Sequence, residues 1–342
     1  MPDLVLDSSA LTPDLRVCFK PLDNVQGGGC HLEVYTVPDA SKPTPVVLMM
    51  HGGGWTMGGP TSIPYAQVRW LREHGIAAAS VEYRMVPHVK MKDMREDCLD
   101  AFRFAQSGLN VALAAANLST VDPTRIGAWG ASAGGTLVLF LGADVGDLVA
   151  SDNTIPPLRA IIPTYPLADF HRFEPGGEHA EDKFDEVCAA DPDFKAKYDA
   201  LLADKCQVSA AWTTEEQTPT PELARRWEFS HQALHNGTLV PLLFDSMPLS
   251  PAASPLGALS ARMPPTFVVV AEADQLIPPS QSYAVVEKLK SLGVDAAAGA
   301  GKDLPHGLAE MLPHQPAWPA GNKWWEDAIE PSLVFMSKYL SN

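Results

Sequence analysis

Residues 125–135 read RIGAWGASAGG, a G-x-S-x-G pattern centred on Ser132. An apolar run leads into the pattern and an apolar run of helical character follows it, so we expect a strand that turns sharply into a helix. Only glycine-sized neighbours fit such a turn. The turn exposes the Ser132 hydroxyl and leaves the N–H of Ala133 unpaired at a helix N-terminus, where it can hold negative charge. The stretch predicts a nucleophile and part of an oxyanion hole, and a glycine-rich turn without chemistry is the alternative.

A second glycine motif, HGGGW at residues 51–55, directly follows the buried-strand pattern VVLMM at residues 46–50. Three consecutive glycines let a loop bring unobstructed N–H groups close to a substrate oxygen, as an oxyanion hole requires. A phosphate-binding loop is the alternative, but no Gly-Lys-Ser/Thr follows the glycines. The two motifs, each placed after a strand, indicate acyl-transfer chemistry more specifically together than either does alone.

A serine nucleophile needs a histidine base and a carboxylate that orients the histidine, and in this architecture their chain order is serine, acid, histidine. Only His306 and His314 follow the last strand-like run, residues 266–271. His306 is the candidate base, because His314 lies in a proline-broken stretch that we expect at the surface. Asp274 is the candidate acid because it closely follows that strand, with Glu272 as its nearest competitor.

Short apolar runs alternate with helical patterns over most of the chain, which predicts a mostly parallel sheet with helices on both faces. The first two runs have no helix between them, so we expect an antiparallel edge with a turn at residues 27–29. The strand-like runs cover residues 16–20, 31–37, 46–50, 77–83, 125–129, 160–166 and 266–271, and the helical patterns cover 66–74, 91–107, 133–141, 280–292 and 332–340.

The alternation of strands and helices breaks between residues 169 and 250, where helices and charged loops replace it. An insertion of this length in a compact domain is usually functional, so we expect a lid over the site. The chain is therefore predicted to have a catalytic domain made of residues 1–168 and 251–342, with residues 169–250 inserted as a helical cap.

The composition is that of a globular protein: 342 residues, 46% hydrophobic and 19% charged, with a formal net charge of −16. This charge repels nucleic-acid phosphates and anionic membranes, so we expect neither as a partner.

The five cysteines form no C-x-x-C pair, which argues against a zinc site or a disulfide framework. We see no signal-peptide pattern, and no apolar run reaches the roughly 18 residues of a membrane span. A cytoplasmic protein is expected.

His231 and His235 lie four residues apart in a helical pattern, a spacing that can bind a metal ion. The glutamate of an H-E-x-x-H motif is absent and the sequence offers no evident third ligand. We therefore expect no metal, and the chemistry predicted for Ser132 requires no organic cofactor.

Several motifs follow one another in order along residues 45–310: HGGGW, YRMVP, GASAGG, SPL, PPT and DQL, closed by His306-Gly307. In these motifs the chain resembles the hormone-sensitive-lipase-like branch of the α/β-hydrolase superfamily. The resemblance implies an α/β-hydrolase fold, in which a mostly parallel twisted sheet is flanked by helices and carries an inserted cap.

The resemblance also implies roles for seven residues. The triad would be Ser132, Asp274 and His306, the oxyanion-hole donors would be the amides of Gly53, Gly54 and Ala133, and His51 would brace the loop.

Three features depart from the family pattern. Ala131 precedes the nucleophile where relatives commonly have aspartate or threonine, and His88 replaces the usual glutamate after the Tyr-Arg-x-x-Pro segment. The segment before the first strand is short, so residues 169–250 are expected to form most of the lid. These differences concern substrate size and lid motion rather than the reaction class.

The residues and the resemblance together predict a serine carboxylesterase that acts on small to medium acyl esters through an acyl-enzyme intermediate. One alternative uses the same site for a non-hydrolytic elimination or cyclisation, or for amide hydrolysis, in a biosynthetic pathway. A ligand-binding receptor is a further alternative, but it would be expected to have lost a triad member. A small-molecule ester is the expected partner, with a homodimer as a possible assembly.

Overall fold

The computed structural model describes residues 11–173, 183–210, 220–245, 249–307 and 323–341. Its centre is an eight-stranded sheet in the order β1-β2-β4-β3-β5-β6-β7-β8. Among these described strands only β2 runs opposite to the rest, because it pairs antiparallel with both β1 and β4. The strands are β1 (Leu15–Pro21), β2 (Gly29–Tyr35), β3 (Thr44–Met50), β4 (Ala77–Val81), β5 (Val121–Ala131), β6 (Ile161–Thr164), β7 (Thr266–Ala271) and β8 (Ala296–Gly301).

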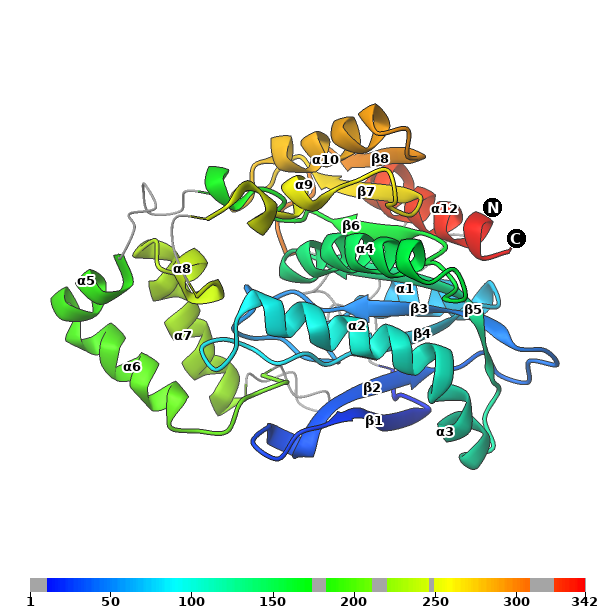
Figure 1. Ribbon diagram of the computed structural model, residues 1–342, viewed down its shortest axis with the longest axis horizontal. Helices are drawn as coiled ribbons and strands as arrows, with labels where there is room; N and C mark the ends of the chain where they lie inside the picture. Colours follow the sequence, from blue (N-terminus) through cyan, green and yellow to red (C-terminus); the bar gives the residue numbers. More distant parts are fainter. Residues whose placement is uncertain (1–10, 174–182, 211–219, 246–248, 308–322, 342) are drawn as a thin grey trace.

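Helices cover both faces of this sheet, which confirms the predicted fold class (Figure 1). The described α-helices are α1 (Tyr65–Glu73), α2 (Met91–Ser107), α3 (Leu109–Ala115), α4 (Ala133–Ser151), α5 (Lys183–Ala190), α6 (Pro192–Leu202), α7 (Pro221–His235), α8 (Leu239–Leu243), α9 (Pro255–Ala258), α10 (Pro279–Ser291) and α12 (Glu330–Leu340). Short 3-10 turns lie at Gln26–Gly28, Phe170–Arg172 and Pro251–Ala253, and a π-helical turn at Trp325–Ile329 precedes α12.

The central strand β3 is buried along its whole length, and its side chains alternate between two cores. Leu48 and Met50 belong to the core under α2 and α4, whereas Val47 and Met49 belong to the core under α1 and α12. A strand with apolar residues on both faces is typical of a parallel sheet between two helical layers. The continuous apolar run after residue 45 therefore explains why β3 lies at the centre.

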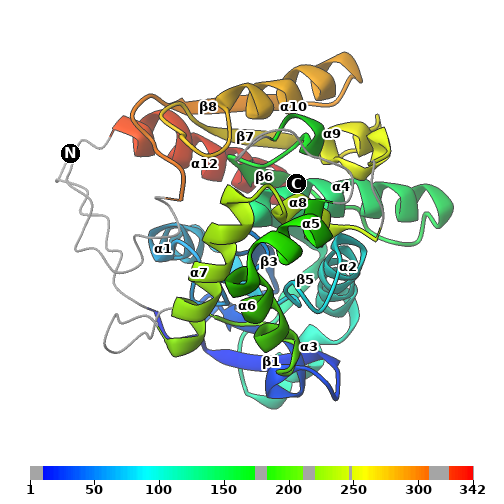
Figure 2. The ribbon, with the colours of Figure 1, turned by 90° about the vertical axis from the view of Figure 1, so that its left-hand side faces the viewer.

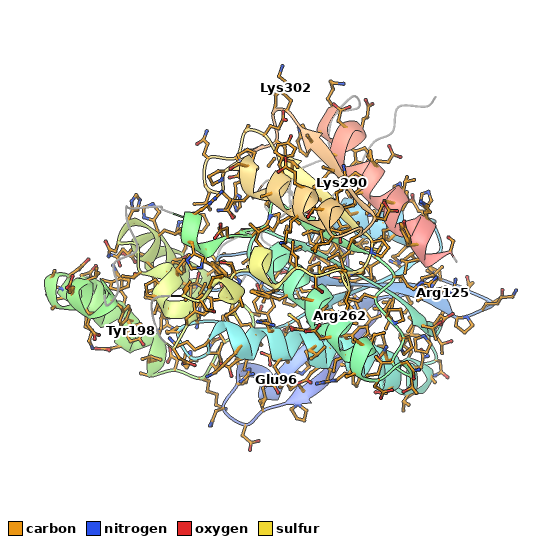
Figure 3. All side chains as sticks on the ribbon, turned by 45° about the horizontal axis from the view of Figure 1, so that its top comes forward. Glu96, Arg125, Tyr198, Arg262, Lys290 and Lys302 are labelled. Carbon is orange, nitrogen blue, oxygen red and sulfur yellow. The ribbon has the colours of Figure 1, made fainter. Side chains whose placement is uncertain are left out.

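Helix α2 shows how the amphipathic pattern places a helix on the sheet. Met94, Cys98 and Phe102 recur at helical spacing and are buried against the sheet. Glu96 lies on the opposite side of the helix and is exposed (Figure 3). Cys98 therefore packs in the core as a small apolar residue.

Helix α4 is long and apolar enough, by length and composition alone, to cross a membrane, with a mean hydropathy of 1.5 over its most apolar window. This corrects the expectation that no apolar run reaches that length. However, 67% of the window is buried inside the protein. The composition of α4 is that of a core helix packed between the sheet, α2 and α9.

Helices α5 to α8 fall within the segment that the sequence sets apart. Figures 1 and 2 show them gathered at one end of the sheet, in front of the loops that follow β3 and β5. An antiparallel bridge joins Gly58, in the loop after β3, to Ala210 of this segment. The division of the chain into a catalytic domain and an inserted cap stays a prediction.

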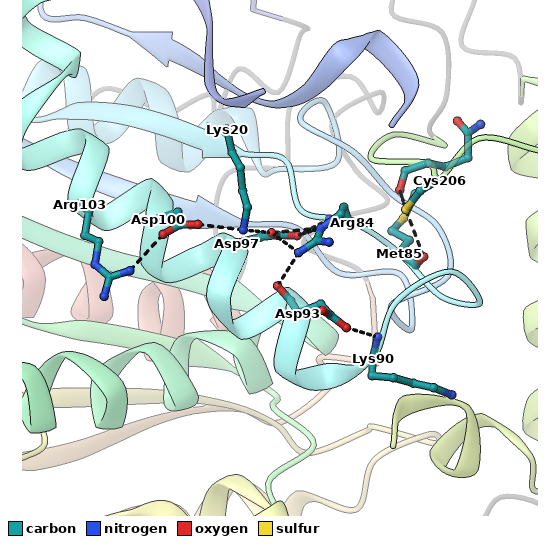
Figure 4. Close-up of polar contacts among 10 residues, drawn as sticks. Lys20, Arg84, Met85, Lys90, Asp93, Asp97, Asp100, Arg103 and Cys206 are labelled. Atoms are coloured by element: carbon teal, nitrogen blue, oxygen red, sulfur yellow. Dashed lines mark hydrogen bonds and ion pairs between the residues drawn. The ribbon is translucent and has the colours of Figure 1, made fainter. Parts of the chain in front are cut away.

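A buried carboxylate ties three elements together (Figure 4). Asp97 on α2 is fully buried and accepts hydrogen bonds from the guanidinium and the backbone N–H of Arg84, at 2.8–3.2 Å. It also accepts one from Lys20 Nζ on β1, at 2.7 Å. Burying these charges is costly unless they are paired, so the pairing fixes the segment that follows β4.

Replacement of Asp97 by alanine would leave Arg84 and Lys20 without their shared partner. We expect the free energy of unfolding to fall by about 3–5 kcal/mol, as is typical when one member of a buried ion pair is removed. Urea denaturation followed by circular dichroism measures the loss. The matched control is Asp245→Ala, which removes the partner of Lys92 from an exposed pair and should leave stability nearly unchanged. Equal losses in the two variants would contradict a structural role for the Asp97 pairing.

Candidate active site

Ser132 lies at the turn between β5 and α4 in a conformation that residues other than glycine rarely adopt. Its φ is 54° and its ψ is −121°. The start of α4 lies so close to the end of β3 that a side chain at Gly134 would collide with the carbonyl oxygen of Met50. The Ser132 N–H donates to the Thr164 carbonyl oxygen at 2.9 Å, which holds the turn against β6. The predicted sharp strand-to-helix turn is therefore confirmed.

Three side chains from separate loops meet at this turn. Ser132 Oγ lies 2.8 Å from His306 Nε2, and His306 Nδ1 lies 2.7 Å from Asp274 Oδ2. The Asp274 side chain is 1% exposed. Its Oδ1 accepts the backbone N–H groups of Leu276 and Ile277, both at 2.8 Å, which fixes the direction of the carboxylate. In this arrangement Asp274 accepts from Nδ1–H, leaving Nε2 free to take the serine proton.

The alternative acid, Glu272, lies elsewhere. Glu272 accepts a hydrogen bond from the Tyr283 hydroxyl at 2.8 Å, at the surface. The structure therefore brings Asp274, and not Glu272, to His306. His314 lies outside the described residues.

The glycine loop after β3 faces the same space as the serine. Gly53 and Gly54 line one cavity with Ser132 and His306. Gly53 has a φ of 111°, and a side chain there would collide with the Met57 carbonyl oxygen. Within the described parts of the chain, the backbone N–H groups of Gly53, Gly54 and Ala133 donate no hydrogen bond. Unpaired donors of this kind can bind an oxygen that gains negative charge.

His51 makes the contacts that a loop-bracing residue would make. It is fully buried, stacks on Tyr83 with ring centroids 4.3 Å apart, and its Nδ1 lies 2.8 Å from the Gly52 carbonyl oxygen. The Tyr83 hydroxyl donates to the His51 carbonyl oxygen at 2.8 Å. Burial lowers the pKa of His51 to about 4, so the ring is neutral at pH 7.

The cavity beside Ser132 has a volume of about 500 Å³. Its lining is mainly apolar, and part of it comes from α7 and α8, in the segment that the sequence predicts as a lid. The large apolar side chains in the lining are Trp55, Met57, Leu167, Phe173, Leu223, Trp227, Leu234, Leu239, Leu276 and Ile277. A space of this size and polarity suits a small or medium apolar group attached to the reacting carbonyl. Trp212 and Met247, which belong to the same predicted lid, lie outside the described residues.

His231 and His235 are exposed on α7, with their Nε2 atoms 3.2 Å apart. His231 lines the cavity. Among the described residues, no group of three or more histidine, cysteine, aspartate or glutamate side chains is placed to hold a metal ion. The expectation that the site works without a metal stays a prediction.

The sharp serine turn, the glycine loop and the helix-flanked parallel sheet define a serine hydrolase with the α/β-hydrolase fold. The BD-FAE family model matches residues 32–208, slightly more than half of the chain. The chain belongs to this family, among the hormone-sensitive-lipase-like α/β hydrolases.

Individual relatives are more distant. Carboxylesterase NlhH of Mycobacterium tuberculosis is 26% identical over 90% of this chain and 80% of its own length. The non-reducing polyketide synthase Preu6 of Preussia isomera is 25% identical over 91% of this chain, which spans only 14% of the synthase. The solved structure of a Pyrobaculum calidifontis esterase matches with a TM-score of 0.60 and 21% identity, over 96% of this chain and 84% of that one. At this identity the structural match shows a shared fold.

The lowered pKa of His51 makes stability depend on pH. Between the folded pKa of about 4 and the ordinary value of 6.5, the unfolded chain binds more protons, so stability is lost as the pH falls through this window. His51→Gln removes this component, on the order of 3 kcal/mol between pH 6.5 and 4. We expect a shallower acid loss of the free energy of unfolding in the variant, measured by urea denaturation at a series of pH values. Equal pH slopes in variant and wild type would show that His51 is not held neutral by burial.

Proposed function

We propose that the chain is a serine carboxylesterase that hydrolyses small to medium acyl esters through an acyl-enzyme intermediate. Ser132 is the nucleophile, His306 the general base and acid, and Asp274 the orienting carboxylate. The observation that supports this most is the continuous contact from Ser132 Oγ through His306 to Asp274, at 2.8 and 2.7 Å, beside the apolar cavity.

In the acylation step, His306 Nε2 takes the hydroxyl proton as Ser132 Oγ attacks the ester carbonyl. The carbonyl oxygen becomes an oxyanion, which the N–H groups of Gly53, Gly54 and Ala133 hold; one such donor is worth about 3 kcal/mol of the barrier. Asp274 stabilises the imidazolium and keeps the ring in the required tautomer. His306 then protonates the departing alkoxide, which leaves as the alcohol.

In the deacylation step, His306 takes a proton from water as the water oxygen attacks the acyl carbonyl. The same three N–H groups hold the second oxyanion, and His306 returns the proton to Ser132 as the acid leaves. These steps balance with ester and water alone, so the mechanism calls for no metal or organic cofactor.

The dimensions and apolar lining of the cavity favour a small or medium acyl or alcohol group. Helices α7 and α8 contribute Leu223, Trp227 and Leu239 to the lining, which supports a substrate-covering role for residues 169–250. We propose a small-molecule ester as the physiological partner. The cytoplasmic location and the homodimer remain predictions from the sequence.

A second candidate function is suggested by the polyketide synthases, which match 78–95% of this chain in six instances. In this case the substrate would be an acyl intermediate of a biosynthetic pathway. The same serine and oxyanion donors would serve a thioester carbonyl, with release by hydrolysis or by a non-hydrolytic step. N-acetylcysteamine thioesters are the probe that separates this candidate from a general esterase.

The wild type should hydrolyse p-nitrophenyl esters, with kcat/KM rising as the acyl chain fills the cavity and falling beyond it. Ser132→Ala should lower kcat by about 10⁴-fold or more, because the nucleophile is lost. The release of p-nitrophenol measures both rates. Undiminished activity in Ser132→Ala would overturn the assignment.

Covalent capture of a fluorophosphonate without hydrolysis of any of the p-nitrophenyl esters would favour the second candidate.

Asp274→Asn should lower kcat by about 10³–10⁴-fold, because the amide no longer selects the productive histidine tautomer. Glu272→Gln is the matched control: this carboxylate lies two residues away and contacts Tyr283, so the variant should keep the wild-type rate. Steady-state kinetics on the best p-nitrophenyl ester make the comparison. Similar losses in both variants would mean that Asp274 has no special role.

A further inference from the structure

Arg226 on α7 is a fully buried arginine for which the esterase mechanism gives no role. Its Nη1 donates to two backbone carbonyl oxygens, those of Thr56 at 2.8 Å and Val86 at 2.9 Å. Its Nε donates to Glu222 Oε1, one helical turn earlier, at 2.5 Å. The guanidinium therefore connects α7 to two loops that lie more than a hundred residues earlier in the sequence.

The first of these carbonyls belongs to the oxyanion loop. The backbone N–H and the hydroxyl of Thr56 both donate to the Gly53 carbonyl oxygen, each at 3.1 Å. The second carbonyl is tied to the same loop, because the Val86 N–H donates to the Trp55 carbonyl oxygen at 3.0 Å. Arg226 thus holds the loop directly through Thr56 and indirectly through Val86.

Helix α7 contacts this loop again one turn further on. Ser230 lies four residues after Arg226, on the same side of the helix, and lines the cavity with Gly54. A Cβ placed on Gly54 would lie 3.4 Å from Ser230 Oγ. The helix and the oxyanion loop therefore also meet one turn beyond the Arg226 hydrogen bonds.

The energetics favour a positioning role over simple stabilisation. A buried ion pair is often no more stabilising than apolar side chains of similar volume, because both charges lose their hydration. The planar guanidinium instead fixes the direction of its hydrogen bonds. Its N–H groups have a rigid geometry, and Nη1 donates to both carbonyl oxygens. Thr56 and Val86 are held at defined positions by this one group.

We propose that Arg226 is a positioning residue that fixes the oxyanion loop, and with it the Gly53 and Gly54 amides, against helix α7. The inference rests on the proposed attack of Ser132 on an ester. A displacement of about 1 Å in such donors can cost about 10²-fold in rate, even when the substrate still binds. Loss of Arg226 should therefore weaken transition-state stabilisation more than ground-state binding.

The test compares Arg226→Met with Arg225→Met. Arg225 is the neighbour on α7 and also pairs with Glu222, but its other partner is Asp204 rather than a loop carbonyl. For Arg226→Met we expect kcat on a p-nitrophenyl ester to fall by about 10–100-fold while KM changes less than about threefold. The inhibition constant of a trifluoromethyl ketone, which forms an oxyanion on Ser132, should rise by the same factor as kcat falls. Arg225→Met should change neither quantity.

A folded Arg226→Met protein with the wild-type kcat and inhibition constant would overturn the inference, as would a change confined to KM. If that variant does not fold, Arg226→Lys takes its place, because the shorter lysine side chain keeps the charge but does not place its nitrogen where Nη1 binds both carbonyls. The same two readouts should then move in the same direction by a smaller factor, and unchanged values would overturn the inference.

Failure of the proposed function would look different, because the wild type itself would hydrolyse no ester. In that event the rate at which Ser132 captures a fluorophosphonate still tests Arg226, because the phosphoryl oxygen enters the same hole. Slower capture in Arg226→Met than in Arg225→Met would support the inference, and equal rates would contradict it.

Discussion

The strained turn at Ser132 is the constraint on which the rest of the site depends. With a φ of 54° the residue reverses the chain from β5 into α4 and leaves its hydroxyl at the edge of the sheet. Helix α4 begins directly against the backbone of Met50. This close approach is possible because Gly134 has no side chain to obstruct it. Ala133 is the first residue of α4, so its N–H lies at the end of the helix that meets the backbone of Met50 and His51. The proposed nucleophile and the proposed oxyanion donors therefore share one backbone geometry.

The parallel sheet completes the constellation. Strands β3, β5 and β7 run in the same direction, so the segments that follow them emerge at one edge. That edge receives the glycine loop, Ser132 and Asp274, and the loop after β8 adds His306. Helix α7 closes the space from outside and contacts the glycine loop through Arg226 and Ser230. The site therefore combines rigid elements of the sheet with one helix from a distant segment.

Much of this arrangement follows from local patterns that the sequence displays. The buried run before HGGGW and the glycines around Ser132 predict their strands and turns, because those residues leave few other conformations. Strand β8 is not predicted, since its sequence AAAGAG has no β-branched or aromatic residue and gains its place only by pairing with β7. The choice between Asp274 and Glu272 depends on side-chain direction, which spacing alone does not give. Arg226 reads as an ordinary charged residue of an amphipathic helix until its carbonyl partners are known.

The most direct measurement of the central claim is the identity of the acylated residue. Wild-type protein mixed with a p-nitrophenyl ester and quenched in acid within the first turnover can be digested and mapped by mass spectrometry. We expect the acyl group on the peptide that contains Ser132, in an amount that matches the initial burst of p-nitrophenol. A burst with the acyl group on another residue, or turnover without any acylated peptide, would contradict the proposed mechanism.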